Sequence, residues 1–391
     1  MTPRLIWLCV VLHLVPAVAG AQGTSADDVV TFLVLNQAVP TGDFTKDAQA
    51  ADATRATLVR SLLVELATFP ITTAAGGFSY RFDPALGTLQ RVSQGFGPFL
   101  LDRASTVGGG HGSVSLTYRS SVFSTLDGRN LRGGAFVTSA NKFRDEPEAF
   151  DVDRLTLDMR TDTVTFLATY GITNRIDVGV AVPFVRLVID GERSNTYRGS
   201  TRVQAQGRAE SVGLADLPIR SKILLFDAVP ARLSAAFDVQ LPTGDPDNLR
   251  GSGQTSLKSA VLASVGSGDI ELHLNAGLIT GGLARQTFGG ASVTASVGSA
   301  LTISGEALMR HVAGPGGIQE VTEPHPLFAG VDTTRLLPAY DGTVTATLVA
   351  GVRWNVATTW LLNVYTLVPL TDTGLNSRPT PAFSIDYSFV R

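Results

Sequence analysis

The chain has 391 residues, of which 44% are hydrophobic and only 17% are charged, and its formal net charge is −3. Soluble domains usually carry about 25% charged residues, so the composition argues against an ordinary water-exposed surface. The balance of 31 Lys and Arg residues against 34 Asp and Glu residues also leaves no basic surface for nucleic acid, and we expect no nucleic-acid partner.

Residues 1–21 are typical of a secretory signal peptide. Arg4 supplies the positive charge, an apolar stretch follows, and Ala19 and Ala21 form an A-x-A cleavage site. The single cysteine, Cys9, lies inside this leader, so the mature chain is predicted to contain none. A secreted protein without cysteine cannot be a disulfide-stapled domain and must be held together by its fold.

Residues 22–111 do not follow the two-residue period of the rest of the chain. Within this region, residues 52–69 carry Leu58, Leu62 and Leu66 at helical spacing and are followed by a proline. We predict an amphipathic helix here, placed in the periplasm or in the barrel lumen. It could plug the lumen, cap the lower mouth of the barrel or pack against another subunit. Within the lumen it would gate passage, and the simplest alternative is that it only closes the barrel end sterically. Residues 76–82 are a candidate short strand.

From residue 112 onward, apolar residues recur at every second position. The clearest case is residues 270–278, in which one face is wholly apolar and the other carries Glu271, His273 and Asn275. Similar stretches occur in sequence order near residues 112–124, 152–170, 175–190, 211–227, 231–241, 256–265, 270–279, 291–299, 301–312, 342–354, 358–369 and 380–391. The pattern predicts an all-β protein with about 12 antiparallel strands.

The connections between these strands alternate between short turns and long polar segments. Long segments are expected near 125–151, 191–210, 242–255, 280–290, 313–341 and 371–379. Outer-membrane barrels show this alternation, with short periplasmic turns and long extracellular loops. A secreted β-sandwich would also alternate apolar and polar residues, but it has no reason to gather its long loops at one end. We therefore predict a transmembrane β-barrel over residues 112–391, and no segment long and apolar enough to form a transmembrane helix.

Charged side chains of both signs fall on the inward faces of the predicted strands or at the extracellular rim. Two interpretations stay open: these residues pair with one another across a narrow interior, or they line a path for solutes. At the rim, an aspartate in a turn usually caps backbone N–H groups, and selection of a substrate is the alternative. The candidate lumen and rim residues are Asp216, Arg220, Lys222, Asp238, Asp245, Glu271, His273 and Arg353.

Catalytic and metal-binding signatures are weak. A Ser-His hydrolase needs a serine within reach of its base, and no G-x-S-x-G motif accompanies His273, the only histidine on a clear strand. The acidic residues near 145–153 lack the ligand spacing of a calcium loop, and the glycines at 108–110 are not followed by the lysine of a P-loop. We expect no catalytic residue, no metal and no cofactor.

Three stretches resemble the MetA-pathway-of-phenol-degradation family of outer-membrane proteins over residues 165–391. They are YGITNRIDVGV at 170–180, GLADL at 213–217, and LPTGD at 241–245 followed by GSG at 251–253. The resemblance implies an outer-membrane channel associated with uptake of aromatic or other hydrophobic compounds. It also implies recognition by the barrel-assembly machinery, although Phe389 is followed here by two further residues.

Taken together, these features predict a passive bacterial outer-membrane channel for small, hydrophobic or aromatic molecules. Its expected partners are outer-membrane lipid, small solutes and the assembly machinery. Two alternatives remain open, a structural or adhesive barrel whose long loops bind a partner and an outer-membrane hydrolase.

Overall fold

The computed structural model describes residues 25–66, 80–83, 88–91, 95–314 and 317–390. The predicted signal peptide therefore lies outside the described residues. The same holds for residues 67–69 of the predicted helix and for residues 76–79 of the predicted short strand.

Twelve antiparallel strands form a closed barrel, as predicted from the sequence. The ring strands pair with one another in the order in which they occur along the chain, and the last, β20, pairs with the first, β3, to close the ring. The strands are β3 (His111–Leu126), β6 (Ala149–Gly171), β7 (Ile176–Tyr197), β9 (Leu217–Ala228), β10 (Ala231–Leu241), β11 (Ser256–Ser267), β12 (Ile270–Gly281), β13 (Gln286–Val297), β14 (Leu301–Val312), β17 (Thr343–Ala357), β18 (Trp360–Pro369) and β20 (Thr380–Val390).

Three of the predicted polar loops are wrong, because these segments form strands. The segment 125–151 contains β4 (Arg129–Asn130) and β5 (Phe136–Phe143), and 191–210 contains the end of β7 and most of β8 (Ser200–Leu214). The segment 313–341 contains β15 (Gly317–Pro324) and β16 (Val331–Ala339), while β19 (Leu375–Ser377) lies in the last connection.

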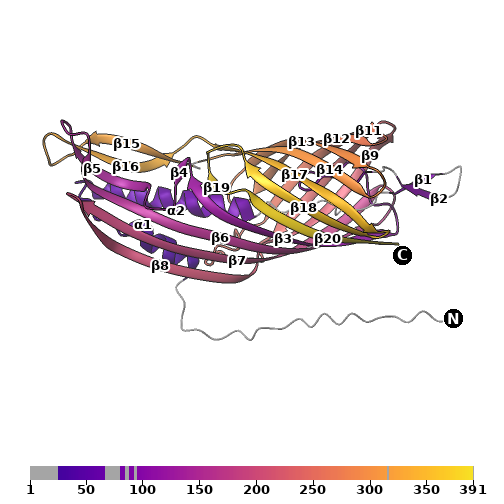
Figure 1. Cartoon of the computed structure of the whole chain (residues 1–391), viewed down its shortest axis with the longest axis horizontal. Coiled ribbons are helices and arrows are strands. Elements are labelled where there is room, and N and C mark those ends of the chain that lie inside the picture. The colour runs from indigo at the N-terminus through magenta and orange to yellow at the C-terminus, as the bar shows by residue number, and fades with distance from the viewer. Residues whose placement is uncertain (1–24, 67–79, 84–87, 92–94, 315–316, 391) are drawn as a thin grey trace, which may run out of the picture.

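These additional strands lengthen one side of the barrel at the end with the long connections. Strands β15, β16, β5, β6, β7 and β8 pair in this order, and we call this part the extension sheet. Figure 1 shows it as the left half of the molecule, with the helices against its inner face. Strands β1 (Tyr80–Asp83) and β2 (Thr88–Arg91) pair with each other and lie beyond the opposite end, next to the short turns.

Two helices fill the concave side of the extension sheet. Helix α1 (Ala26–Leu35) begins at Ser25, whose hydroxyl accepts the Asp28 N–H at 3.1 Å in a capping box. Helix α2 (Phe44–Leu66) includes the predicted helical residues but begins eight residues earlier. Both helices lie at the end of the barrel with the long connections, and their placement in the periplasm or in the lumen stays a prediction. In the part of the chain that the structure describes, neither helix is long and apolar enough to cross a membrane.

The apolar face changes sides along individual strands. In the part of β6 within the extension sheet, Leu155, Leu157 and Met159 point inward and pack in a core with α1 and α2. From Val164 onward, the apolar residues at even positions of the same strand, such as Val164 and Phe166, are exposed and point outward instead, while Leu167 stays buried. The strand therefore contains two halves whose apolar faces are opposite.

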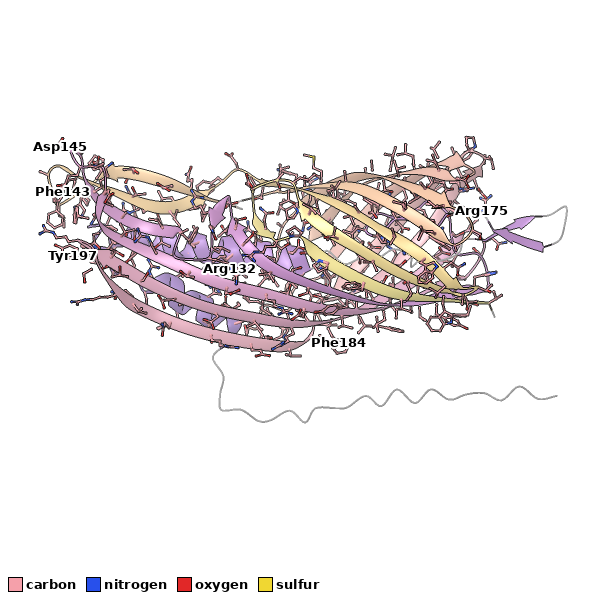
Figure 2. All side chains as sticks on the ribbon, viewed as in Figure 1. Arg132, Phe143, Asp145, Arg175, Phe184 and Tyr197 are labelled. Atoms are coloured by element: carbon pink, nitrogen blue, oxygen red, sulfur yellow. The ribbon has the colours of Figure 1, made fainter. Side chains whose placement is uncertain are left out.

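Neighbouring strand β7 changes at the same level. Asp162 lies opposite Arg186 on the outer surface, and the next outward pair is Val164 opposite Phe184. Figure 2 shows Phe184 near the middle of the long axis and Tyr197 at the tip of the extension sheet. Outward apolar side chains continue from this level to the short turns around the ring, for example Phe237, Val261, Leu274, Ile303, Val364 and Phe383.

An exposed apolar belt around a closed barrel is the surface that such a barrel presents to lipid. Tyr170, Phe226, Trp354 and Trp360 are exposed beside the short turns, and the ring of Trp360 packs at a tilt against that of Tyr387 with centroids 4.8 Å apart. Aromatic residues at this height are typical of a membrane interface. The outer surface of the extension sheet carries exposed ion pairs, such as Arg132 with Asp158 and Arg208 with Asp190, and we therefore place this sheet and its helices outside the lipid.

Candidate functional site: the occupied lumen

The interior of the barrel is occupied by residues 95–107, an irregular segment just before β3 that we call the plug. Almost all of its side chains are buried, and Phe96, Phe99 and Ala104 are each at most 2% exposed. Its backbone follows the lumen and meets inward-facing side chains of the wall from Thr302 to Asp177. No sequence pattern predicts the plug, because its apolar residues recur at neither strand nor helix spacing.

Wall carboxylates accept hydrogen bonds from the plug backbone. The Glu306 carboxylate on β14 accepts the N–H groups of Phe99, of Leu100 at 3.0 Å and of Leu101 at 2.9 Å. Further along the plug, the Asp177 carboxylate on β7 accepts the Val107 N–H at 3.0 Å. Hydrogen bonds to charged acceptors are about twice as strong as neutral ones, so these contacts hold an irregular backbone in place.

Amide and hydroxyl groups of the wall complete the set of backbone partners. The Asn275 side chain binds both the N–H and the carbonyl oxygen of Asp102, at 2.9 and 2.8 Å. The Ser264 hydroxyl accepts the Ala104 N–H at 2.8 Å. These bonds satisfy a buried backbone that has no strand partner.

Charged groups tie the middle of the plug to the wall. Arg220 on β9 donates to Asp102 Oδ2 at 2.7 Å and also binds the Asp238 carboxylate on β10. Lys222 donates to the carbonyl oxygens of Arg103 at 3.2 Å and Ser105 at 2.6 Å, and its Nζ lies 3.6 Å from Asp102 Oδ1. The predicted lumen residues Arg220, Lys222 and Asp238 thus meet in one buried network that includes the plug.

Arg353 binds the opposite end of the plug. Its guanidinium donates to the Pro98 carbonyl oxygen and lies 4.5 Å from the centroid of the Phe99 ring. It also lies 3.4 Å from the Asp386 carboxylate, and Phe99 stacks on Tyr365 with centroids 4.5 Å apart. These inward-facing charged residues therefore bind other protein groups, and their partner is often the plug and not a side chain across the barrel.

Glu271 and His273 lie on the inward face of β12. Glu271 lies 3.4 Å from the Arg232 guanidinium, and His273 lies 2.8 Å from the Ser264 hydroxyl and 3.3 Å from the Thr294 hydroxyl. Within the part of the chain that the structure describes, no carboxylate lies within hydrogen-bond distance of the imidazole, since Glu271 is 4.0 Å away. Among the described residues, no group of three or more His, Cys, Asp or Glu residues could hold a metal ion.

The two rim aspartates organise the loop 242–255. Asp216 is buried and accepts the N–H groups of Gly244 at 3.0 Å and Ser252 at 2.7 Å, together with the Ser252 hydroxyl at 2.8 Å. Asp245 accepts from Asn248 and Arg250, and its hydrogen bond with the Asn248 side chain lowers the pKa of the Asp245 carboxyl. Both rim aspartates therefore make loop contacts, and substrate selection by them stays a prediction.

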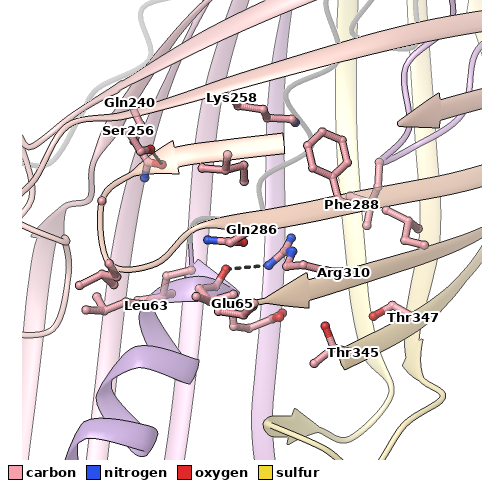
Figure 3. Close-up of a pocket in the computed structure, with 18 of the residues that line it drawn as sticks. Leu63, Glu65, Gln240, Ser256, Lys258, Gln286, Phe288, Arg310, Thr345 and Thr347 are labelled. Atoms are coloured by element: carbon pink, nitrogen blue, oxygen red, sulfur yellow. Dashed lines mark hydrogen bonds between the residues drawn. The ribbon is translucent and has the colours of Figure 1, made fainter. Parts of the chain in front are cut away.

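A cavity of about 220 Å³ lies between the plug and the end of α2. Its floor includes Leu100, Leu101 and Asp102 of the plug, and its roof is the last turn of α2. The wall is formed by the ends of β9 to β14 and β17 to β19, and Leu283 and Ser252 of the rim loops also line it. Figure 3 shows Lys258, Gln286, Phe288 and Arg310 around this space, with Leu63 and Glu65 of α2 below them in this view.

Comparison with known proteins gives only distant structural likenesses. No family model matches the chain, and no curated protein matches it by sequence. The chain is similar in structure to the COG4313 outer membrane channel from Pseudomonas putida F1, with a TM-score of 0.44 and 12% identity, covering 73% of this chain and 98% of that one.

Two further solved structures are similar at lower scores. They are the KdgM porin in complex with disordered oligogalacturonate, with a TM-score of 0.36, 7% identity and coverage of 70% and 99%, and the OmpF of Salmonella typhi in complex with daunomycin, with a TM-score of 0.30, 9% identity and coverage of 72% and 98%. Because all three TM-scores lie below 0.5, no conclusion about this chain is drawn from them. The resemblance to the phenol-degradation family likewise stays a prediction.

Proposed function

We propose that this protein is an outer-membrane channel for small amphipathic or hydrophobic molecules and that the plug closes it at rest. The apolar belt supports a location in a lipid bilayer, and the predicted signal peptide directs the chain to the bacterial envelope, where β-barrels of this kind reside in the outer membrane. The resemblance to a family associated with aromatic compounds favours solutes of that class.

The observation that carries the proposal is the way in which the lumen is filled. A purely structural small barrel fills its interior with side chains from its own wall. Here a separate segment occupies the lumen, and polar bonds to the wall hold its backbone. Such bonds can be exchanged for bonds to water without changing the strand ladder, so the plug can leave its place while the barrel persists.

A reversible crosslink tests this proposal. Ala104 of the plug and Ala236 of β10 belong to one buried cluster, and the mature chain is predicted to contain no other cysteine. In planar bilayers, the oxidised pair Ala104→Cys and Ala236→Cys should show no openings, and reduction should restore the openings that occur when the plug leaves the lumen. The two single-cysteine variants serve as controls and should respond to neither treatment.

A second variant keeps the test decisive if the crosslink fails to form. Deletion of residues 95–107 should give a barrel that still migrates as a folded, heat-modifiable species and that conducts continuously. A folded deletion variant with no conductance would overturn the channel and leave the structural or adhesive barrel as the better account. Sustained conductance by the oxidised pair, equal to that of the reduced pair, would show that the plug does not close the lumen.

A further inference from the structure

The chemistry of the cavity above the plug indicates which solutes it holds. Its lining includes the carboxylates Asp102, Asp216, Asp238 and Glu65 and the cations Arg60, Arg220, Arg250, Lys258 and Arg310. What matters for a ligand is how much of this hydrogen-bonding capacity the protein itself already uses.

The carboxylates are engaged with the protein. Asp238 binds Arg220 and lies 3.4 Å from Lys258 Nζ, and Asp102 Oδ2 accepts from Arg220. Asp216 accepts three hydrogen bonds from the rim loop, and Glu65 lies 3.8 Å from the Arg119 guanidinium. A cationic ligand would therefore have to displace existing partners.

Donors, in contrast, are left over. The Arg60 Nη1 atom is buried without a hydrogen-bond partner among the described residues. The Lys258 ammonium has three N–H bonds and lies 3.4 Å from the carboxylate of Asp238, which Arg220 already binds through two nitrogens. A small anion in the cavity could therefore accept hydrogen bonds from Arg60 of the roof or Lys258 of the wall without breaking an existing contact.

A neutral polar group faces the same space. Gln286 is 9% exposed, and its Oε1 atom has no hydrogen-bond partner within the described ranges. Figure 3 shows its amide in the cavity near Arg310. A buried amide oxygen that accepts no hydrogen bond destabilises the folded state unless a donor on a ligand or a water molecule binds it.

The rest of the wall is apolar. Phe288 stands beside Lys258, with the ammonium nitrogen 5.0 Å from the ring centroid, and Leu63, Leu101 and Leu308 surround the space. A charge next to an aromatic face fits a ligand that has a charged end and an apolar body. A volume of about 220 Å³ holds a single small molecule of this kind.

We infer that the cavity binds a small amphipathic carboxylate, with the carboxylate on Lys258 and Arg60 and the apolar body against Phe288 and the leucines. The unpartnered Gln286 Oε1 is an acceptor, so it would pair with a hydroxyl or N–H group on the body of the ligand and not with its carboxylate. The inference rests on the proposed function in one respect, since a solute must reach the cavity. It goes further by assigning the solute a charge.

The test uses the full chain folded in detergent micelles, with benzoate and the uncharged benzyl alcohol as probes of similar size. Calorimetry should show tighter binding of benzoate. Lys258→Gln and Arg60→Gln should each weaken benzoate binding by about tenfold, the effect of one charge-assisted contact, and should leave benzyl alcohol unaffected. Lys142→Gln is the matched control, because Lys142 is exposed on the extension sheet and distant in the fold from the cavity lining.

The possible outcomes separate this inference from the channel itself. Benzyl alcohol binding as tightly as benzoate, or benzoate binding that survives both substitutions, would overturn the anionic ligand while leaving the conductance experiment untouched. If the plug-deletion variant does not conduct while the full chain binds benzoate as expected, the channel is rejected and the binding site is retained.

Discussion

Arg220 of the barrel wall and Asp102 of the plug form a buried ion pair, with the guanidinium Nη1 atom 2.7 Å from the carboxylate. Arg220 simultaneously binds Asp238, so one side chain links the plug to a carboxylate of the neighbouring strand. The charge that holds the plug is therefore already compensated within the wall. This arrangement lets the plug leave without stranding a lone buried cation.

Asp102→Asn is expected to loosen the plug and spare the barrel. The amide carries no charge, so the plug loses one charge-assisted bond, while Arg220 keeps its bond to Asp238. Loss of such a bond costs roughly 1.5–3 kcal/mol, which corresponds to an open probability at least tenfold higher in single-channel recordings. Arg132→Gln, which breaks an exposed ion pair with Asp158 on the extension sheet, should change nothing. Equal open probabilities in the wild type and Asp102→Asn would show that this pair does not hold the plug.

The strand pattern predicted the ring of twelve strands because lipid and lumen impose strict alternation on each strand. It could not predict the extension sheet in the same way. Leu155, Leu157 and Met159 alternate as regularly as Val164 and Phe166 do, but their alternation is shifted by one residue. Such a shift marks the level where a strand leaves the lipid and its inner face begins to cover helices.

Strand alternation predicts which face a candidate residue occupies, but it does not predict the partner of that residue. Arg220, Lys222 and Arg353 face inward as alternation requires. Their partners Asp102, Ser105 and Pro98 lie in a segment whose position depends on tertiary contacts alone. No periodic signal in residues 95–107 reveals that this segment returns into the barrel.

Substitution of Phe166 by arginine should destabilise the barrel in lipid. Phe166 points outward within the apolar belt, where a guanidinium costs roughly 2–4 kcal/mol near the middle of the bilayer. Asp158→Arg, on the outward face of the same strand but within the extension sheet, should have nearly no effect. The free energy of unfolding from lipid vesicles measures both. A similar loss in the two variants would place the lipid boundary elsewhere than between Asp162 and Val164.

Leu33 of α1 should stabilise the extension sheet independently of the barrel. Its side chain is fully buried and lies against Gly191 of β7 and Gly207 of β8, where a Cβ atom at Gly191 would be 2.3 Å from Leu33 Cδ1. Leu33→Ala should therefore cost about 2–5 kcal/mol of local stability. The expected result is faster proteolysis of α1 with unchanged heat-modifiability of the barrel. Exposed Leu35→Ala is the control, and a loss of barrel heat-modifiability in Leu33→Ala would show that the two parts unfold together.

The orientation of the molecule in the membrane can be tested with two single cysteines. Asp145 is exposed at the tip of the extension sheet, and Arg175 is exposed in the short turn between β6 and β7, at opposite ends of the long axis (Figure 2). Outer-membrane barrels place short turns in the periplasm. A membrane-impermeant maleimide should therefore label Asp145→Cys on intact cells, and Arg175→Cys only after the outer membrane is permeabilised. The reverse pattern would put α1, α2 and the extension sheet in the periplasm, and the cavity would then receive solutes from inside the cell envelope.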